Sequence, residues 1–219
     1  MDKLDYKKEY KDLYLPKTKP ALIEVPAMTF AMVDGRGDPN REGGEYQQAL
    51  AVLYALSYTI KMSRMGGNTP AGYFDYVVPP LEGLWWMDDG SPVDFAHMDK
   101  ERFCWTAMIR QPAFVTPEVF GWACGEAARK KGLDVSHARL EALEEGLCAQ
   151  VMHLGSYDAE GPVLEGLDSF IAQQGYAPDY GAALPTGQPR RHHEIYLTDA
   201  RRCKPEKNRT VLRTPIRKG

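Results

Sequence analysis

The segment Arg191–Asp199, with the sequence RHHEIYLTD, contains the residue types that most strongly indicate chemistry. Its alternation predicts a β-strand with Ile195 on one face and His192, Glu194 and Tyr196 on the other. Burying an unpaired charge costs several kcal/mol, so the glutamate lies either on the solvated face of an edge strand or in a pocket that uses it. In a pocket, a carboxylate either takes a proton from a bound molecule or serves as the counter-charge of a cation.

A second glutamate has a similar setting in the segment Leu81–Met87, with the sequence LEGLWWM. In an extended strand, Glu82 and Trp86 share a face. The segment Phe103–Arg110 is expected to pair with this strand, so that Trp86 and Trp105 would form one wall of an aromatic clamp. For each tryptophan, ordinary core packing is the alternative.

Composition and charge narrow the class of protein. The chain has 219 residues, of which 43% are hydrophobic and 26% charged, as in a globular protein of one large domain or two small ones. A net charge of −3 gives no reason to expect a nucleic-acid or membrane partner. No window approaches the roughly 20 apolar residues of a membrane helix, and the start lacks the apolar core of a signal peptide. We therefore expect a cytoplasmic protein.

The cysteines and histidines give no sign of a metal site. The four cysteines are widely spaced, without a CxxC pair: Cys104, Cys124, Cys148 and Cys203. Neither a zinc site nor a disulfide framework is expected, and the thiols should be reduced. His192 and His193 are adjacent, so they point to opposite faces of their strand. We expect no metal and no cofactor.

The elements that would position these residues follow from hydrophobic periodicity and from proline and glycine breaks. We expect strands at Ala21–Val33, Tyr73–Val78, Leu81–Met87, Phe103–Arg110, Leu147–Leu154, His192–Thr198 and Arg209–Arg213. We expect helices at Glu45–Ser63, Thr116–Lys131, Ser136–Glu145 and Gly161–Gly175. Residues 1–20 would form an ordered arm.

The order strand–helix–strand–strand occurs twice, at 27–87 and 147–214, which indicates an internal duplication of structure. We predict an α+β fold in which duplicated β-α-β-β units form one antiparallel sheet with helices on one face. The opposite face would carry a ligand groove at the pseudo-twofold axis, with both Glu82 and Glu194 in it. Residues 1–219 would form a single domain, with an N-terminal half-repeat at about 21–111, inserted helices at about 116–146 and a C-terminal half-repeat at about 147–219.

Four runs of residues carry a resemblance to a known family. They are Phe30–Asn40 (FAMVDGRGDPN), Asp75–Trp86 (DYVVPPLEGLWW), Met152–Tyr157 (MHLGSY) and Glu194–Lys207 (EIYLTDARRCKPEK). With these runs the chain resembles the GyrI-like small-molecule-binding family, in particular its stand-alone branch, from about Tyr10 onwards. The resemblance implies the duplicated fold predicted above.

The resemblance also implies a site. In ligand-sensing relatives the glutamate of the EIYL-type strand, here Glu194, lies in an aromatic pocket and meets cationic aromatic ligands. The tyrosine of the MHLGSY-type motif, here Tyr157, belongs to the same site. Some stand-alone relatives are cyclopropanoid cyclopropyl hydrolases, which open the cyclopropane of DNA-alkylating, duocarmycin-like compounds. No helix-turn-helix segment is present in this sequence, so we do not expect a DNA-binding regulator.

These implications lead to two hypotheses. In the first, the chain is a cofactor-independent hydrolase: Glu194 takes a proton from water that attacks the strained ring, and Tyr157 or Tyr196 donates a hydrogen bond to the oxygen that gains charge. An aromatic groove and a nearby Glu82 would raise the pKa of Glu194. In the second, the chain is a non-catalytic binder of cationic aromatic molecules, with Glu194 as the counter-charge.

Both hypotheses use the same residues, and the sequence leaves open whether the protein is an enzyme. The expected catalytic residues are Glu194 and Tyr157. The expected ligand-binding residues are Glu82, Trp86, Trp105, Tyr196, Tyr76 and Met32. The expected partner is a small molecule, with no nucleic acid and no membrane, and the protein would be a monomer or a homodimer.

Overall fold

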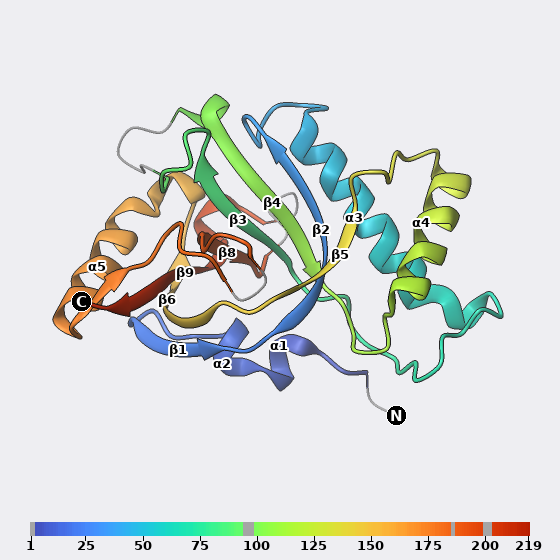
Figure 1. Cartoon of the computed structure of the whole chain (residues 1–219), viewed down its shortest axis with the longest axis horizontal. Helices are drawn as coiled ribbons and strands as arrows, with labels where there is room; N and C mark the ends of the chain where they lie inside the picture. Colours follow the sequence, from blue (N-terminus) through green and yellow to red (C-terminus); the bar gives the residue numbers. More distant parts are fainter. Residues whose placement is uncertain (1–2, 94–98, 185–186, 199–202) are drawn as a thin grey trace.

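A computed structural model describes residues 3–93, 99–184, 187–198 and 203–219. In these residues the strands form one curled antiparallel sheet (Figure 1). Its strands follow the order β1–β6–β9–β8–β3–β4–β2–β5, and a short β7 pairs only with the end of β9. The bounds are β1 Ala21–Val25, β2 Met28–Arg36, β3 Leu81–Met87, β4 Phe103–Arg110, β5 Arg139–Leu143, β6 Gly146–Leu154, β7 Tyr176–Pro178, β8 His192–Tyr196 and β9 Arg209–Lys218.

The strand order contains an internal symmetry. One unit is β2-α3-β3-β4 and the other is β6-α5-β8-β9, with α3 at Glu45–Met62 and α5 at Gly161–Gln173. Read from the outside inwards, the sheet runs β2–β4–β3 on one side and β6–β9–β8 on the other, so the two units meet where β3 pairs with β8. The predicted α+β fold with two β-α-β-β units is therefore confirmed.

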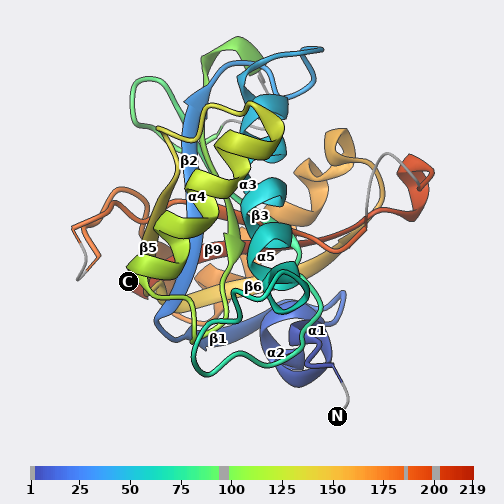
Figure 2. The same cartoon turned by 90° about the vertical axis from the view of Figure 1, so that its right-hand side faces the viewer.

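Helices α3 and α5 cover the same face of the sheet, here called the helix-bearing face. The buried stripe of α3 includes Leu53 and Leu56, and α5 buries Leu167 and Ile171. Helix α4, at Pro117–Lys131, packs against α3 rather than against the sheet (Figure 2). Across the described residues, every helix is too short or too polar to span a lipid bilayer.

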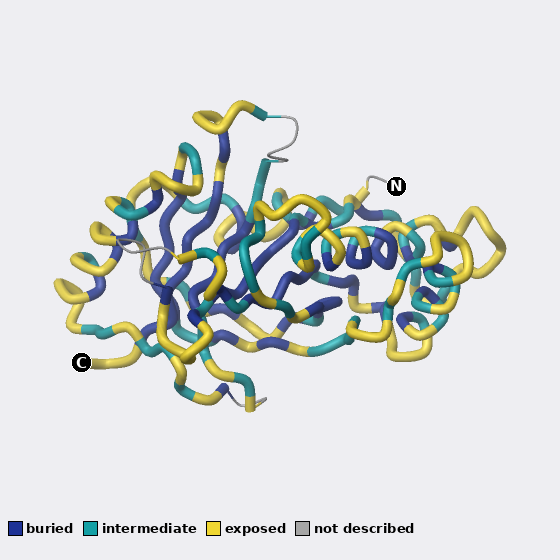
Figure 3. Tube along the Cα trace, turned by 90° about the horizontal axis from the view of Figure 1, so that it is seen from above, coloured by how far each residue is buried: buried dark blue, intermediate teal, exposed yellow. Residues whose placement is uncertain are grey.

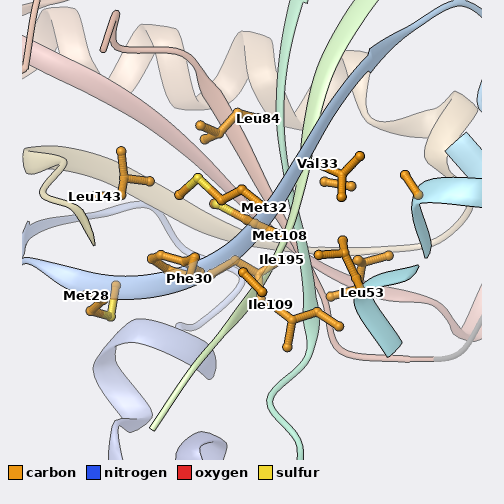
Figure 4. Close-up of a cluster of buried hydrophobic side chains, with 14 of the residues drawn as sticks. Met28, Phe30, Met32, Val33, Leu53, Leu84, Met108, Ile109, Leu143 and Ile195 are labelled. Carbon is orange, nitrogen blue, oxygen red and sulfur yellow. The ribbon is translucent and has the colours of Figure 1, made fainter. Parts of the chain in front are cut away.

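The sheet curls around its other face, here called the inner face. Side chains from well-separated strands meet there, among them Phe30, Met32, Met108, Leu143 and Ile195 (Figure 4). The burial pattern follows the sheet, whose strands are mostly buried while the connecting loops are exposed (Figure 3). The inner face is therefore a packed core.

The N-terminal residues form the ordered arm that was predicted. Helices α1 (Tyr6–Glu9) and α2 (Lys11–Tyr14) bury Tyr6, Leu13 and Tyr14. The guanidinium group of Arg110 lies 4.7 Å from the ring centroid of Tyr6 and 4.4 Å from that of Tyr10, so a cation–π contact fastens the arm to β4.

Three predicted elements were wrong. Ala21–Val33 is two strands, because the chain bends at Pro26 and β1 pairs with β6 while β2 pairs with β4 and β5. Ser136–Glu145 has a helix-like composition but contains the strand β5. Its pairing with β2 buries Leu143, and this burial outweighs the helix propensity of the segment. Tyr73–Val78 is not a strand: Tyr76 makes only an isolated bridge to Leu4.

We predict that Gly35→Ala destabilises the fold by about 1–3 kcal/mol, the usual cost of overpacking a filled core. A methyl group at Gly35 would overlap Cη2 of Trp105, whose ring covers this position from the paired strand. Urea unfolding measures the effect. Gly121→Ala is the control, because no atom lies within 4 Å of its added methyl group, and it should be neutral or stabilising. Equal unfolding free energies for the two variants would contradict the prediction.

Candidate functional site

Glu194 lies near the centre of the sheet, on the helix-bearing face. Strand β8 lies between β3 and β9, and Gly83 of β3 is the residue directly opposite Glu194. The side chain of Glu194 is only 10% exposed. The alternative of a solvated edge strand is therefore excluded, and the carboxylate lies in an enclosed setting.

A chain of hydrogen bonds ends on this carboxylate. The indole Nε1–H of Trp85 donates to the hydroxyl oxygen of Tyr196 at 2.8 Å, and that hydroxyl donates to Oε2 of Glu194 at 2.8 Å. On the other side, Nε2 of His192 lies 3.3 Å from Oε1 of Glu194. Burial, and next the charge of Glu194, raise the pKa of Tyr196 well above its usual value, so Tyr196 keeps its proton.

Aromatic side chains surround this chain of hydrogen bonds. The ring of Tyr46, at the start of α3, lies 5.5 Å from the Trp85 ring and 5.0 Å from the Trp105 ring. Tyr157, in the short 3₁₀ helix Tyr157–Ala159 before α5, meets the ring of Tyr196 edge-on at 5.7 Å and is 37% exposed. Tyr157 thus forms the outer rim, and the site lies between the first turns of the two repeated helices.

Gly83 makes room for this arrangement. A methyl group at position 83 would lie 2.7 Å from Nε1 of Trp85 and 3.2 Å from the hydroxyl oxygen of Tyr196. The strand opposite Glu194 therefore needs glycine, because the two polar atoms that support the carboxylate occupy the space above it.

The structure adds a residue that the sequence reasoning missed. Glu160 directly precedes α5 and is 2% exposed, and its Oε1 atom has no hydrogen-bond partner among the described residues. Burial, and next repulsion by Glu194 and Asp158, raise the pKa of Glu160 well above its usual value. In the sequence, an acid before Gly161-Pro162 is typical of a helix start and gave no signal of its own.

Further unpaired polar atoms lie beside Tyr196. Thr210 is opposite Tyr196 in the sheet, and His153 is opposite Thr210 on the next strand. Oγ1 of Thr210 and Nδ1 of His153 are buried without a partner in the described part of the chain. An unsatisfied buried polar group costs about 1–3 kcal/mol, and such groups concentrate at sites that bind water or ligand.

The predicted site residues divide between the two faces. The structure brings Glu194, Tyr196, Tyr157 and Trp105 together on the helix-bearing face. It does not bring Glu82 to them, because Glu82 lies opposite Ile195 and points to the inner face. The predicted groove with both glutamates is therefore wrong.

The other three predicted ligand-binding residues also lie elsewhere. Trp105 is opposite Trp85 rather than Trp86, so Trp86 is on the other face, where the guanidinium group of Arg191 lies 4.8 Å from its ring centroid. Met32 belongs to the inner core (Figure 4). The ring of Tyr76 packs 6.0 Å from Phe114, beneath the N-terminal arm.

On the inner face, Glu82 belongs to a buried chain of charges. Oε2 of Glu82 lies 3.0 Å from Nε2 of His193, and Nδ1 of His193 lies 2.9 Å from Oε2 of Glu145. The same Glu145 oxygen accepts a hydrogen bond from Nη1 of Arg213 at 2.9 Å. Although burial disfavours its charge, the two carboxylates raise the pKa of His193 to about 9. Burial also opposes the charge of Glu145, but His193 and Arg213 lower its pKa to about 2.

Cavities and metal-binding groups do not mark the Glu194 site. A cavity of about 220 Å³ lies near the turn between β5 and β6, lined by residues such as Glu144, Leu147 and Arg190, and Glu194 is not among its lining residues. No group of three His, Cys, Asp or Glu side chains in the described ranges is arranged to hold a metal ion.

We predict that Gly83→Ala breaks the hydrogen bond between Trp85 and Tyr196 and costs about 1–3 kcal/mol of unfolding free energy. Urea unfolding of Gly83→Ala, Tyr196→Phe and the double variant forms a double-mutant cycle. Because both changes act on the same hydroxyl, the combined cost should be smaller than the sum. Strictly additive costs would show that the methyl group acts elsewhere.

We predict a pH-dependent stability from His193. Its pKa in the folded protein is about 9, above the usual 6.5, so its contribution is complete below about pH 6.5 and is lost as the pH rises through about 9. The loss should be on the order of 3 kcal/mol, from 1.36 kcal/mol per pKa unit. Urea unfolding from pH 6 to 10 should show this decline in the wild type and in His137→Gln, an exposed control, but not in His193→Gln. A decline of equal size in His193→Gln would contradict the assignment.

Comparison with known proteins is consistent with this architecture. The sequence matches the family of the GyrI-like small molecule binding domain over residues 18–217. A protein from Listeria innocua described as a hydrolase is 45% identical, with a TM-score of 0.86, and the match covers 98% of this chain and 100% of that chain. A second Listeria innocua structure, described as an uncharacterized conserved protein, is 47% identical with a TM-score of 0.88 and the same coverage. Among curated proteins, none matches this sequence. Because the family match extends over nearly the whole chain, the protein belongs to the GyrI-like small-molecule-binding domain family.

Proposed function

We propose that this protein binds planar aromatic or hydrophobic small molecules at Glu194 and hydrolyses reactive, cyclopropane-bearing compounds of the duocarmycin type. The observation that carries the proposal is the carboxylate itself: Glu194 is 10% exposed, lies at the centre of the sheet and is oriented by the hydroxyl of Tyr196. Such a group is expensive to bury unless it acts on something. The similar Listeria innocua protein described as a hydrolase supports an enzymatic role.

The chemistry assigns one role to each group. Glu194 takes a proton from a water molecule, and the water oxygen attacks the strained ring carbon. The carbon–carbon bond breaks, and its electron pair moves through the conjugated system to the carbonyl oxygen of the ligand. Tyr196 donates its proton to Glu194, and Tyr157, 37% exposed at the rim, would donate a hydrogen bond to the ligand oxygen. The rings of Tyr46 and Trp85 would hold the planar molecule.

A non-catalytic binder of cationic aromatic molecules is the second candidate. The same aromatic side chains would supply cation–π contacts, and Glu194 would supply the counter-charge. Nε2 of His192 lies 3.3 Å from Oε1 of Glu194, so a cationic ligand would have to share this carboxylate oxygen with the imidazole. A neutral ligand meets no such competition, which favours the first candidate.

We propose a cytoplasmic location for this activity. The four cysteines are free thiols, and free thiols are usual where the cell keeps cysteine reduced. A detoxifying role would follow, since the ligand class in question damages DNA inside cells.

We predict that Glu194→Gln lowers the rate of ring opening by about 100-fold or more, because an amide keeps the shape of the side chain but cannot accept a proton. The substrate is a duocarmycin-like spirocyclopropyl cyclohexadienone, and chromatography follows its conversion to the ring-opened alcohol. Glu24→Gln, an exposed strand glutamate, is the control and should keep the wild-type rate.

The outcomes separate the two candidates. Loss of turnover in Glu194→Gln with binding retained supports the hydrolase. A wild-type protein that binds the compound without opening it is a sequestering binder. A wild-type protein that does neither contradicts the proposed ligand class.

A further inference from the structure

Glu160 has a position that its secondary structure does not explain. It precedes the first residue of α5, where a side chain usually accepts a hydrogen bond from the exposed amide groups of the helix. Its side chain makes no such bond. It is 2% exposed, and Oε1 has no partner among the described residues. A glutamate that neither caps its helix nor forms an ion pair gives the fold no stability that would offset its burial.

The surroundings of Glu160 belong to the Glu194 site. The backbone N–H of Glu160 donates to the carbonyl oxygen of Tyr157 at 3.2 Å, so it is held by the residue that forms the rim. Glu194 and Tyr196 on β8 are close enough for Glu160 to interact electrostatically with both. Asp158, in the short helix Tyr157–Ala159 that precedes Glu160, is a further charged group that interacts with it.

These neighbours determine the protonation of the pair. Two buried carboxyl groups whose charges interact repel each other when both are ionised, and this repulsion favours a proton on one of them. Glu194 receives the hydrogen bond from Tyr196, which stabilises its ionised form. Glu160 has no donor to do the same, and its pKa is raised by burial and by Glu194. Burial without a hydrogen-bond donor therefore makes Glu160 the member of the pair that favours the protonated form.

We propose that Glu160 is the second catalytic carboxyl group of this site, the general acid that protonates the ligand oxygen while Glu194 receives the proton of water. The inference rests on the proposed function and adds to it the residue that completes the reaction. It also defines the ligand: a neutral molecule whose conjugated carbonyl oxygen reaches Glu160 while its strained carbon reaches the water beside Glu194.

The step is balanced. The water oxygen forms a bond to the ring carbon, and its proton goes to Glu194. The carbon–carbon bond of the cyclopropane breaks, and its electron pair converts the carbonyl oxygen into a phenol oxygen that takes the proton of Glu160. One water molecule is added, and nothing is oxidised or reduced. Transfer of one proton from Glu194 to Glu160 restores the starting state.

The test compares Glu160→Gln with Glu165→Gln, an exposed glutamate on the same helix. With the spirocyclopropyl cyclohexadienone as substrate, we expect kcat to fall by about 100-fold in Glu160→Gln, with KM changed less than about threefold. The wild-type rate should fall at alkaline pH as Glu160 ionises, which gives the pH–rate profile an alkaline limb. Glu160→Gln should lose this limb. Glu165→Gln should match the wild type in all three respects.

Two further measurements keep the test decisive. Glu160→Asp retains a carboxyl group, so it should have a lower kcat but still lose activity at alkaline pH as that group ionises. If Glu160 were merely structural, the loss of activity at alkaline pH would not depend on an acid at this position. Without substrate, the infrared spectrum at neutral pH should contain the carbonyl band of a protonated carboxylic acid, and Glu160→Gln should lose it while Glu165→Gln keeps it.

The failures are distinguishable. If the wild type opens the ring and Glu160→Gln has the wild-type kcat and alkaline limb, Glu160 is not the acid and only this inference falls. Absence of the infrared band from the wild type also overturns it. If the wild type opens no ring, the proposed function falls and the inference falls with it.

Discussion

The buried chain of charges on the inner face determines which way the functional strand faces. His193 lies between Glu82 and Glu145, and Glu145 also binds Arg213, so two positive and two negative groups balance one another in the core. Side chains alternate along a strand, so fixing His193 inwards fixes Glu194 outwards, towards the helices. A slip of β8 by one residue would leave buried charges unpaired, at a cost of several kcal/mol. The orientation of the catalytic candidate thus depends on its neighbour in the chain.

A groove with both glutamates was expected because each repeat has a strand glutamate, but the pairing of β3 with β8 separates the two side chains. Residues that are opposite each other share a face, and Gly83 is opposite Glu194, while Glu82 is opposite Ile195 on the other face. The two halves have therefore taken different roles. One supplies the carboxylate, and the other supplies a glycine that leaves room for the indole of Trp85.

Sequence patterns identified much of the fold, because hydrophobic periodicity and proline–glycine breaks are local signals. They predicted α3, α4 and α5 and placed Glu194 beside Tyr196 on one face of a strand. They did not determine which face of one strand lies beside which face of the next. Side chains alternate between two faces along each strand, so a register shift of one residue exchanges the faces and leaves the pattern within the strand unchanged. That ambiguity misplaced Glu82 and Trp86. Glu160 was missed for another reason: in sequence it has the appearance of an ordinary helix start, and only its burial without a partner distinguishes it.

The side chain of Glu194 lies between its own strand, which is firmly held in the sheet and is here called the floor, and a short turn over it, here called the cover. The floor is β8, whose residues are hydrogen-bonded on both sides within the sheet and held by buried charges. The cover is the turn Tyr157–Ala159, which is tied across the molecule by an ion pair of 2.9 Å between Lys100 and Asp158. The Asp158 side chain is 73% exposed, and exposed pairs contribute only about 0–1 kcal/mol. This ion pair therefore adds little to the stability of the turn, whereas β8 is held by its hydrogen bonds to two strands and by the charges on the inner face.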